Sequence, residues 1–120
     1  MNRMTIVAYV IVLAVVLAAV YTYTGDNRVS GVRARSMIRD GTVKTVVDVR
    51  TETEYALGHY PGAINIPIGQ IGPKTAKLVD KTGGVLVYCN TGQRARYGAN
   101  KFKKMGFETY YIAGSYRSIV

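Results

Sequence analysis

Val85–Arg94 reads V-L-V-Y-C-N-T-G-Q-R, and this stretch decides the fold because a strand, a polar turn and a helix start meet in it. The run Val85–Tyr88 has the composition of a short buried strand and leads into Cys89, the only cysteine of the chain. From Gln93 to Met105 the apolar residues recur at helical spacing. Backbone N–H groups and the positive end of a helix dipole therefore converge on the thiol. Such surroundings stabilise the thiolate, which is the nucleophilic form of cysteine.

Strands and helices alternate outward from this stretch. Strands are predicted at Lys44–Val49, Val85–Tyr88 and Glu108–Ile112, with a short extended piece at Ala63–Pro67. One helix is predicted from the N-cap Ser30 to about Arg39, and a short one begins after Thr51 or Thr53 and ends at Gly58. In Ile68–Leu78 any helix is broken or begins late, over Pro73–Val79. The last predicted helix begins at Gln93. This alternation predicts an α/β domain whose central parallel sheet is flanked by helices. Ligands bind at the carboxyl ends of such strands, where Asp48 and Cys89 both lie.

Composition narrows the classes of partner. The chain has 120 residues, enough for one domain, and a formal net charge of +9. Its basic residues are scattered without a nucleic-acid-binding motif, so we expect a small anionic substrate and no nucleic-acid partner. A single cysteine excludes an intramolecular disulfide and an internal resolving thiol. We expect neither a metal nor a cofactor.

The N-terminal segment is apolar throughout. Met4–Tyr23 would form a helix of about 30 Å, the thickness of a bilayer's hydrocarbon core. Tyr21 and Tyr23 suit the headgroup zone at one end. We predict a transmembrane helix over residues 1–24, a polar linker at Thr24–Asn27 and a globular domain over residues 25–120. A cleaved signal peptide is the alternative.

Charge also predicts the orientation of this segment. One basic side chain, Arg3, precedes it, and four follow closely, at Arg28, Arg33, Arg35 and Arg39. The positive-inside rule then places the globular part in the cytoplasm. A free reactive thiol is consistent with that reducing compartment.

Several segments together carry a family resemblance. They read V-V-D-V-R, E-Y-A-L-G-H-Y-P-G-A-I-N-I-P, V-Y-C-N-T-G-Q-R-A, and K-M-G-F followed by Y-Y-I-A-G-S-Y. In order and spacing they resemble a single-domain rhodanese over nearly all of Ser30–Tyr116. The resemblance implies an α/β domain with a central parallel sheet, and sulfur transfer through a cysteine persulfide. Similar small rhodaneses include exported periplasmic forms of the phage-shock type, so an exported domain is an alternative to the cytoplasmic one.

A sulfurtransferase needs a thiolate that attacks the sulfane sulfur of a donor such as thiosulfate and releases sulfite. Cys89 is the candidate nucleophile, and cyanide or a thiol is the candidate acceptor. The persulfide must be held as an anion, which the loop can do through the backbone N–H groups of Asn90, Thr91, Gly92, Gln93 and Arg94. The Arg94 guanidinium can offer a fork to an oxyanion or stabilise the thiolate.

Two further residues are predicted to support the site. We interpret Asp48 as a buried carboxylate that accepts N–H bonds from a loop. Arg50 is expected to pair with an acid such as Glu54, and its place at a strand end keeps it a candidate for substrate contact. His59 lies in a turn and is expected to be structural rather than a general base.

Two alternative activities remain open. The related dual-specificity phosphatases have a C-x5-R loop, whereas Cys89 and Arg94 form C-x4-R, so phosphatase or arsenate reductase activity is less favoured. A sulfur carrier that receives sulfur from a partner protein is the closer alternative. The chain also departs from many rhodaneses after Gly114, where it lacks a tryptophan-bearing helix, so a closing helix is expected to be short or absent.

Overall fold

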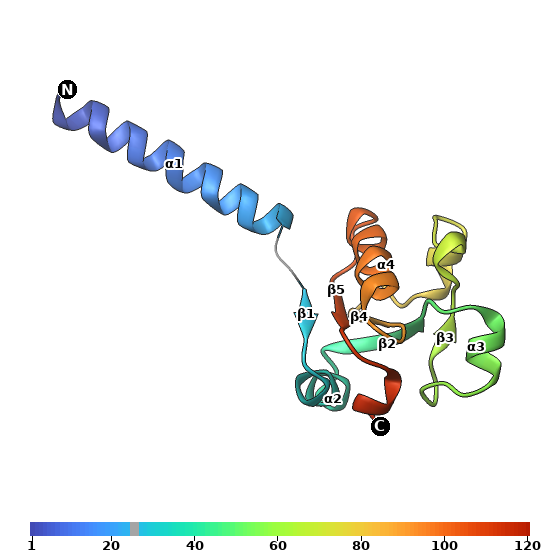
Figure 1. Cartoon of the computed structure of the whole chain (residues 1–120). Helices are drawn as coiled ribbons and strands as arrows, with labels where there is room; N and C mark the ends of the chain where they lie inside the picture. Colours follow the sequence, from blue (N-terminus) through green and yellow to red (C-terminus); the bar gives the residue numbers. More distant parts are fainter. Residues whose placement is uncertain (25–26) are drawn as a thin grey trace.

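The computed structural model describes residues 1–24 and 27–120. Its centre is a five-stranded sheet in the order β1-β5-β4-β2-β3, in which every strand pair is parallel (Figure 1). The strands are β1 (Arg28–Val29), β2 (Val43–Asp48), β3 (Ile64–Asn65), β4 (Gly84–Tyr88) and β5 (Thr109–Ile112). The predicted α/β fold with a central parallel sheet is therefore confirmed. The strand that leads into Cys89 lies in the middle of the sheet.

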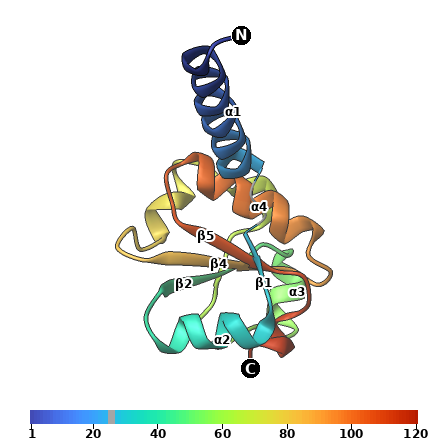
Figure 2. The ribbon, with the colours of Figure 1, turned by 90° about the vertical axis from the view of Figure 1, so that its left-hand side faces the viewer.

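Helices cover both faces of this sheet, as Figure 2 shows for α4 above it and α2 below. The α-helices of the globular part are α2 (Gly31–Arg39), α3 (Glu52–Ala56) and α4 (Gln93–Lys104). Single 3₁₀ turns complete it at η1 (Ile68–Gln70), η2 (Thr75–Leu78) and η3 (Tyr116–Ser118). The helix predicted over Pro73–Val79 is thus reduced to η2, and the short closing helix is confirmed as η3.

The predicted helix starts are confirmed by their caps. The Ser30 hydroxyl accepts the N–H of Arg33 at 3.1 Å, which satisfies one free donor at the start of α2. Of the two candidates for α3, Thr51 is the cap, and it forms a capping box with Glu54. This box fixes the position of Glu54 at the start of α3.

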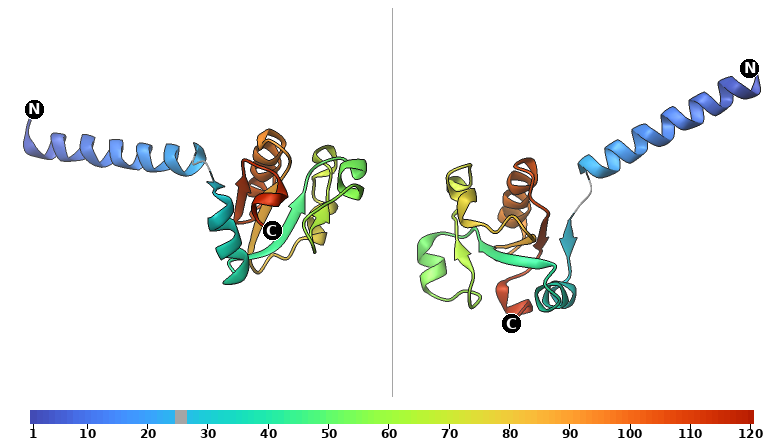
Figure 3. Two further views of the ribbon diagram at one scale, coloured as in Figure 1. Left: turned by 60° about the horizontal axis from the view of Figure 1, so that its bottom comes forward. Right: turned by 180° about the vertical axis from the view of Figure 1, so that it is seen from behind.

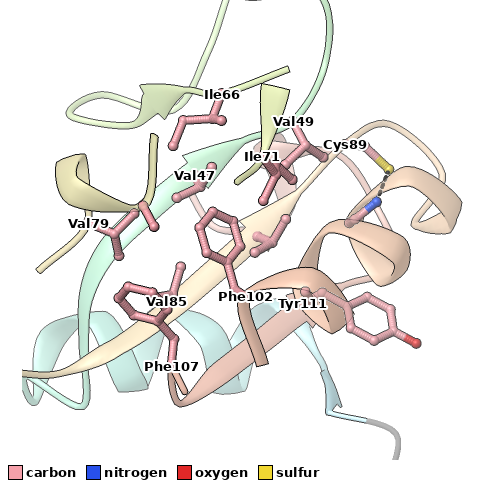
Figure 4. Close-up of a cluster of buried hydrophobic side chains, with 14 residues drawn as sticks. Val47, Val49, Ile66, Ile71, Val79, Val85, Cys89, Phe102, Phe107 and Tyr111 are labelled. Atoms are coloured by element: carbon pink, nitrogen blue, oxygen red, sulfur yellow. Dashed lines mark hydrogen bonds between the residues drawn. The ribbon is translucent and has the colours of Figure 1, made fainter. Parts of the chain in front are cut away.

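The central strand β4 divides its side chains between two cores. Val85, Val87 and Cys89 lie in the core beneath α4, with Phe102 of that helix (Figure 4). Leu86 and Tyr88 belong to the core on the α2 side. Successive residues of a strand point to opposite faces, so Tyr88 and Cys89 necessarily face different layers.

The close approach of α4 to the sheet depends on Gly98. A Cβ built there would lie 3.1 Å from Ile71 and 3.2 Å from Val49, tighter than ordinary contact. The helix therefore lies close over the sheet, and its first turn is held beside the end of β4.

The N-terminal helix α1 (Arg3–Thr24) projects away from the sheet and its covering helices (Figure 3). Among the described residues it is the one helix long and apolar enough to cross a membrane, with a mean hydropathy of 2.5 over Arg3–Val20 and none of that window buried. A signal sequence meets the same criteria. The predicted boundary after residue 24, part of the predicted linker, and the side chains of Tyr21 and Tyr23 lie outside the described residues.

Candidate active site

Cys89 lies directly after β4 and is 1% exposed. Its Sγ accepts hydrogen bonds from two backbone N–H groups, that of Gly92 at 3.0 Å and that of Ala95 at 3.3 Å. Figure 4 shows the thiol aimed at the first turn of α4. Two oriented N–H groups and the N-terminus of a helix together stabilise a negative charge on sulfur.

Gly92 gives the loop its shape. Its φ of +99° lies in the left-handed region, where a side chain is strained. A Cβ at this position would also lie 2.8 Å from Cα of Ala113 in the segment after β5. Glycine therefore lets the turn close tightly enough for its own N–H to reach Sγ.

The structure brings the predicted loop residues Asn90, Thr91, Gly92, Gln93 and Arg94 together around Cys89. Of their backbone N–H groups, that of Gly92 bonds Sγ in the described structure, and the second donor is the unpredicted Ala95. Ala95 lies in the first turn of α4, where N–H groups have no partner within the helix. The helical pattern that begins at Gln93 was the signal that could have identified it. The role of the loop in holding a persulfide stays a prediction.

Glu54 joins α3 to this loop. Its carboxylate forms a bidentate ion pair with Arg94, at 2.7 Å from one terminal nitrogen and 3.0 Å from the other. The Nδ2 group of Asn90 donates to the same carboxylate at 2.8 Å. The two guanidinium nitrogens of Arg94 that were predicted to bind an oxyanion thus bind the Glu54 carboxylate. The sequence had not placed Glu54 at this loop.

Arg50 pairs with a nearby acid, as expected, but that acid is not Glu54. The Arg50 guanidinium instead pairs with Asp48, 2.8 Å from Oδ2, and both side chains are buried. Asp48 lies at the end of β2, only two residues before Arg50, and both are held in the interior. Glu54 is turned toward the loop that follows Cys89 by the start of α3.

Asp48 is the centre of a buried network, as its predicted supporting role required. Its carboxylate accepts the backbone N–H of Arg50 at 2.9 Å, the Arg50 side chain, and the hydroxyl of Tyr88 at 2.7 Å. Burial and the nearby Asp48 carboxylate raise the pKa of Tyr88, so its hydroxyl stays protonated and donates. The guanidinium also donates to the Gly58 carbonyl at 2.6 Å and, at 3.4 Å, to Oδ1 of Asn90. Through the bond from Arg50 to Asn90, the network therefore supports the start of the loop.

His59 is structural, as expected. Its Nδ1 lies 2.9 Å from the carbonyl oxygen of Tyr55, and its ring stacks on the Tyr55 ring at 3.7 Å. These contacts fold the turn after α3 back on that helix. None of the hydrogen bonds described for His59 reaches the loop that follows Cys89.

A hollow of about 290 Å³ opens beside the loop. Its walls come from Arg50, Glu54, Leu57, Asn90, Tyr116 and Arg117. In residues 1–24 and 27–120, His, Cys, Asp and Glu side chains do not gather in groups of three or more that would hold a metal ion. The hollow offers room for a small molecule beside Asn90 of the loop, with charged and apolar walls.

We predict that Asp48→Asn lowers the free energy of unfolding by about 3–5 kcal/mol, because it leaves the buried Arg50 cation without its counter-charge. Urea denaturation measures this loss. Glu52→Gln, the same change at an exposed position of α3, serves as the control and should be nearly neutral. A loss for Asp48→Asn as small as that of the control would contradict the structural role given to Asp48.

The Glu54–Arg94 pair predicts a pH dependence. Hydrogen bonds from Arg94 and Thr51 hold the pKa of the Glu54 carboxyl below its ordinary value of 4.5. The unfolded chain therefore takes up this proton first, so the pair stabilises the fold above pH 4.5 and loses that effect as pH falls further. The stability difference between the native chain and Glu54→Gln should shrink below that pH. It should not exceed about 1 kcal/mol, because both side chains are partly exposed. A difference that grows on acidification in urea titrations would refute this assignment.

Comparison with known proteins agrees with this geometry. Residues 32–120 match the sequence profile of the rhodanese-like domain. The Escherichia coli thiosulfate sulfurtransferase PspE is 35% identical over 74 residues, which are 61% of this chain and 71% of that protein. The Bacillus subtilis putative sulfur carrier protein YrkF is 33% identical over 63 residues, 52% of this chain but only 34% of that protein. The human single-domain sulfurtransferase TSTD1 superposes with a TM-score of 0.62 at 26% identity, covering 77% of this chain and 93% of its own. With a cysteine held at the start of α4 by loop and helix N–H groups, the chain belongs to the rhodanese-like domain family.

Proposed function

We propose that the protein is a sulfurtransferase that moves sulfane sulfur from a donor such as thiosulfate to a thiol or cyanide, through a persulfide on Cys89. The observation that carries this proposal is the pair of N–H bonds from Gly92 and Ala95 to Sγ. They stabilise the thiolate before attack. Relatives named as a thiosulfate sulfurtransferase and as a putative sulfur carrier support sulfur transfer in general.

The reaction divides into two displacements at sulfur. The Cys89 thiolate attacks the sulfane sulfur of thiosulfate, a new S–S bond forms, and the old S–S bond breaks with its electron pair leaving on sulfite. The acceptor then attacks the outer sulfur of the persulfide and returns Cys89 as thiolate. In the thiolate the negative charge lies on Sγ, where the N–H groups of Gly92 and Ala95 donate, whereas in the persulfide it lies on the outer sulfur, where the other N–H groups of the loop would donate.

The loop length supports sulfur transfer over phosphate chemistry. Cys89 and Arg94 stand in a C-x4-R arrangement, shorter than the C-x5-R loop of the related phosphatases. Gly92 keeps this turn tight, with its own N–H on the sulfur.

A sulfur carrier is the second candidate. The near-complete burial of Cys89 favours it, because a protein partner that reshapes the loop would gain access that a free solute lacks. The name of YrkF points the same way. In that case Cys89 receives its sulfur from a partner protein and reacts little with thiosulfate.

Mass spectrometry of the purified chain after brief thiosulfate treatment distinguishes the two candidates. For the sulfurtransferase we expect rapid addition of about 32 Da, the mass of one sulfur atom, and its removal by cyanide as thiocyanate. Cys89→Ser should abolish both. Thiocyanate formation that survives this substitution would refute the role of Cys89, and absence of the adduct in the native chain would favour the carrier.

We also propose that α1 anchors the domain in a membrane, with the globular part on the cytoplasmic side. The length and hydropathy of α1 support the anchor, and the basic residues that follow it support the orientation. An exported domain, or a cleaved segment, is the alternative.

A reporter fused after Val120 tests this placement. Green fluorescent protein should fluoresce there and alkaline phosphatase should be inactive, because the first matures in the cytoplasm and the second outside it. The membrane fraction should contain the fusion at its full mass. The reverse pattern of activities would contradict the cytoplasmic placement, and a fusion shortened at its N-terminus would contradict the anchor.

A further inference from the structure

Both arginines next to the catalytic loop are held by carboxylates. Arg50 is paired with Asp48, and Arg94 is paired with Glu54. The chain as a whole carries a formal charge of +9, yet these two cations are neutralised where an anionic donor would arrive. The two pairs differ in access, because the first is buried and the second is partly exposed.

Glu54 binds two side chains of the loop, those of Arg94 and Asn90. One oxygen of its carboxylate contacts one nitrogen of Arg94, and the other oxygen contacts both the second nitrogen of Arg94 and Nδ2 of Asn90. The side chains of Arg94 and Glu54 are 35% and 29% exposed, so a solute can reach the pair. The capping box with Thr51 holds Glu54 in this position from its own helix.

We propose that Glu54 is a specificity-determining residue: its carboxylate occupies the anion-binding fork of Arg94, so a dianionic sulfur donor must displace it, whereas a monoanionic donor is less penalised. The inference rests on the proposed sulfur transfer. A guanidinium binds a carboxylate or an oxyanion group through the same two parallel N–H bonds, so the two compete directly. The Glu54 charge also repels a dianion twice as strongly as a monoanion at the same distance. The donors favoured by the native chain are therefore monoanions such as organic persulfides and thiosulfonates.

The chemistry at sulfur is the same for both classes of donor. With thiosulfate the leaving group is sulfite, and with benzenethiosulfonate it is benzenesulfinate. In each case Cys89 gains one sulfur atom, and the electron pair of the broken S–S bond leaves with the departing group. A difference between the donors thus reports on charge recognition rather than on a change of reaction.

The experiment compares Glu54→Gln with Glu52→Gln in the full chain, using thiosulfate and benzenethiosulfonate as donors. Glutamine preserves the capping box, so α3 is expected to stay folded. Removing one negative charge about 6 Å from a dianion should lower the KM for thiosulfate by about tenfold, and that for benzenethiosulfonate by about threefold. Glu52→Gln removes an equal charge from an exposed site of α3 and should change neither KM appreciably.

A binding measurement separates this inference from the proposed function. In the Cys89→Ser background, calorimetric titration with sulfate, an unreactive dianion, should give a Kd about tenfold lower when Glu54 is also replaced by glutamine. A KM for thiosulfate or a Kd for sulfate that is unchanged or higher in Glu54→Gln would overturn the inference, and would mean that Glu54 positions Arg94 for binding. If no donor yields a persulfide while sulfate binding tightens as expected, the proposed reaction fails and the competition at Arg94 stands.

Discussion

The parallel pairing of β2 with β4 is the constraint on which the site depends. It sets Asp48 beside Tyr88 in register, so the two strands end at the same edge of the sheet. The Tyr88 hydroxyl and the Arg50 guanidinium then both reach the Asp48 carboxylate inside the domain. Burial of a carboxylate and a guanidinium costs desolvation free energy, which their ion pair and the hydrogen bonds of Asp48 offset. The Cys89 loop is thus supported by a buried hydrogen-bonded network. Cys89 follows Tyr88 directly and points to the opposite face, toward α4.

A second consequence of this arrangement concerns charge. Arg50 connects the buried network to Asn90, and Asn90 in turn donates to Glu54. The loop is therefore held between the buried ion pair of Asp48 with Arg50 and the partly exposed ion pair of Glu54 with Arg94. The first is a permanent part of the fold. The second can exchange its anion, because solvent reaches it. The site thus combines a cysteine whose Sγ accepts two backbone N–H bonds with a partly exposed ion pair at the same loop.

The resemblance in sequence and the geometry of the site agree because both depend on the same local feature. A buried strand, a tight turn through glycine and a helix start follow one another within a few residues, and such short-range order is strongly specified by residue type. The caps at Ser30 and Thr51 were predictable for the same reason. The helix predicted over Pro73–Val79 is the exception, since that segment forms only one 3₁₀ turn, whose Ala76 joins the same core as Phe102 of α4.

The sequence by itself determined the α/β class, the parallel sheet, the strand that presents Cys89, the glycine turn and the membrane-compatible length of the first helix. These properties follow from periodicity, turn residues and composition along a continuous stretch. Only the tertiary structure decided which carboxylate holds which arginine. Arg50 has an acid on each side along the chain, Asp48 two residues before it and Glu54 four residues after it, and the sequence did not show which of them it pairs with. The burial of Arg50 beside Asp48 and the placement of α3 against the loop settled the matter, because together they bring Glu54 to Arg94, 40 residues away along the chain.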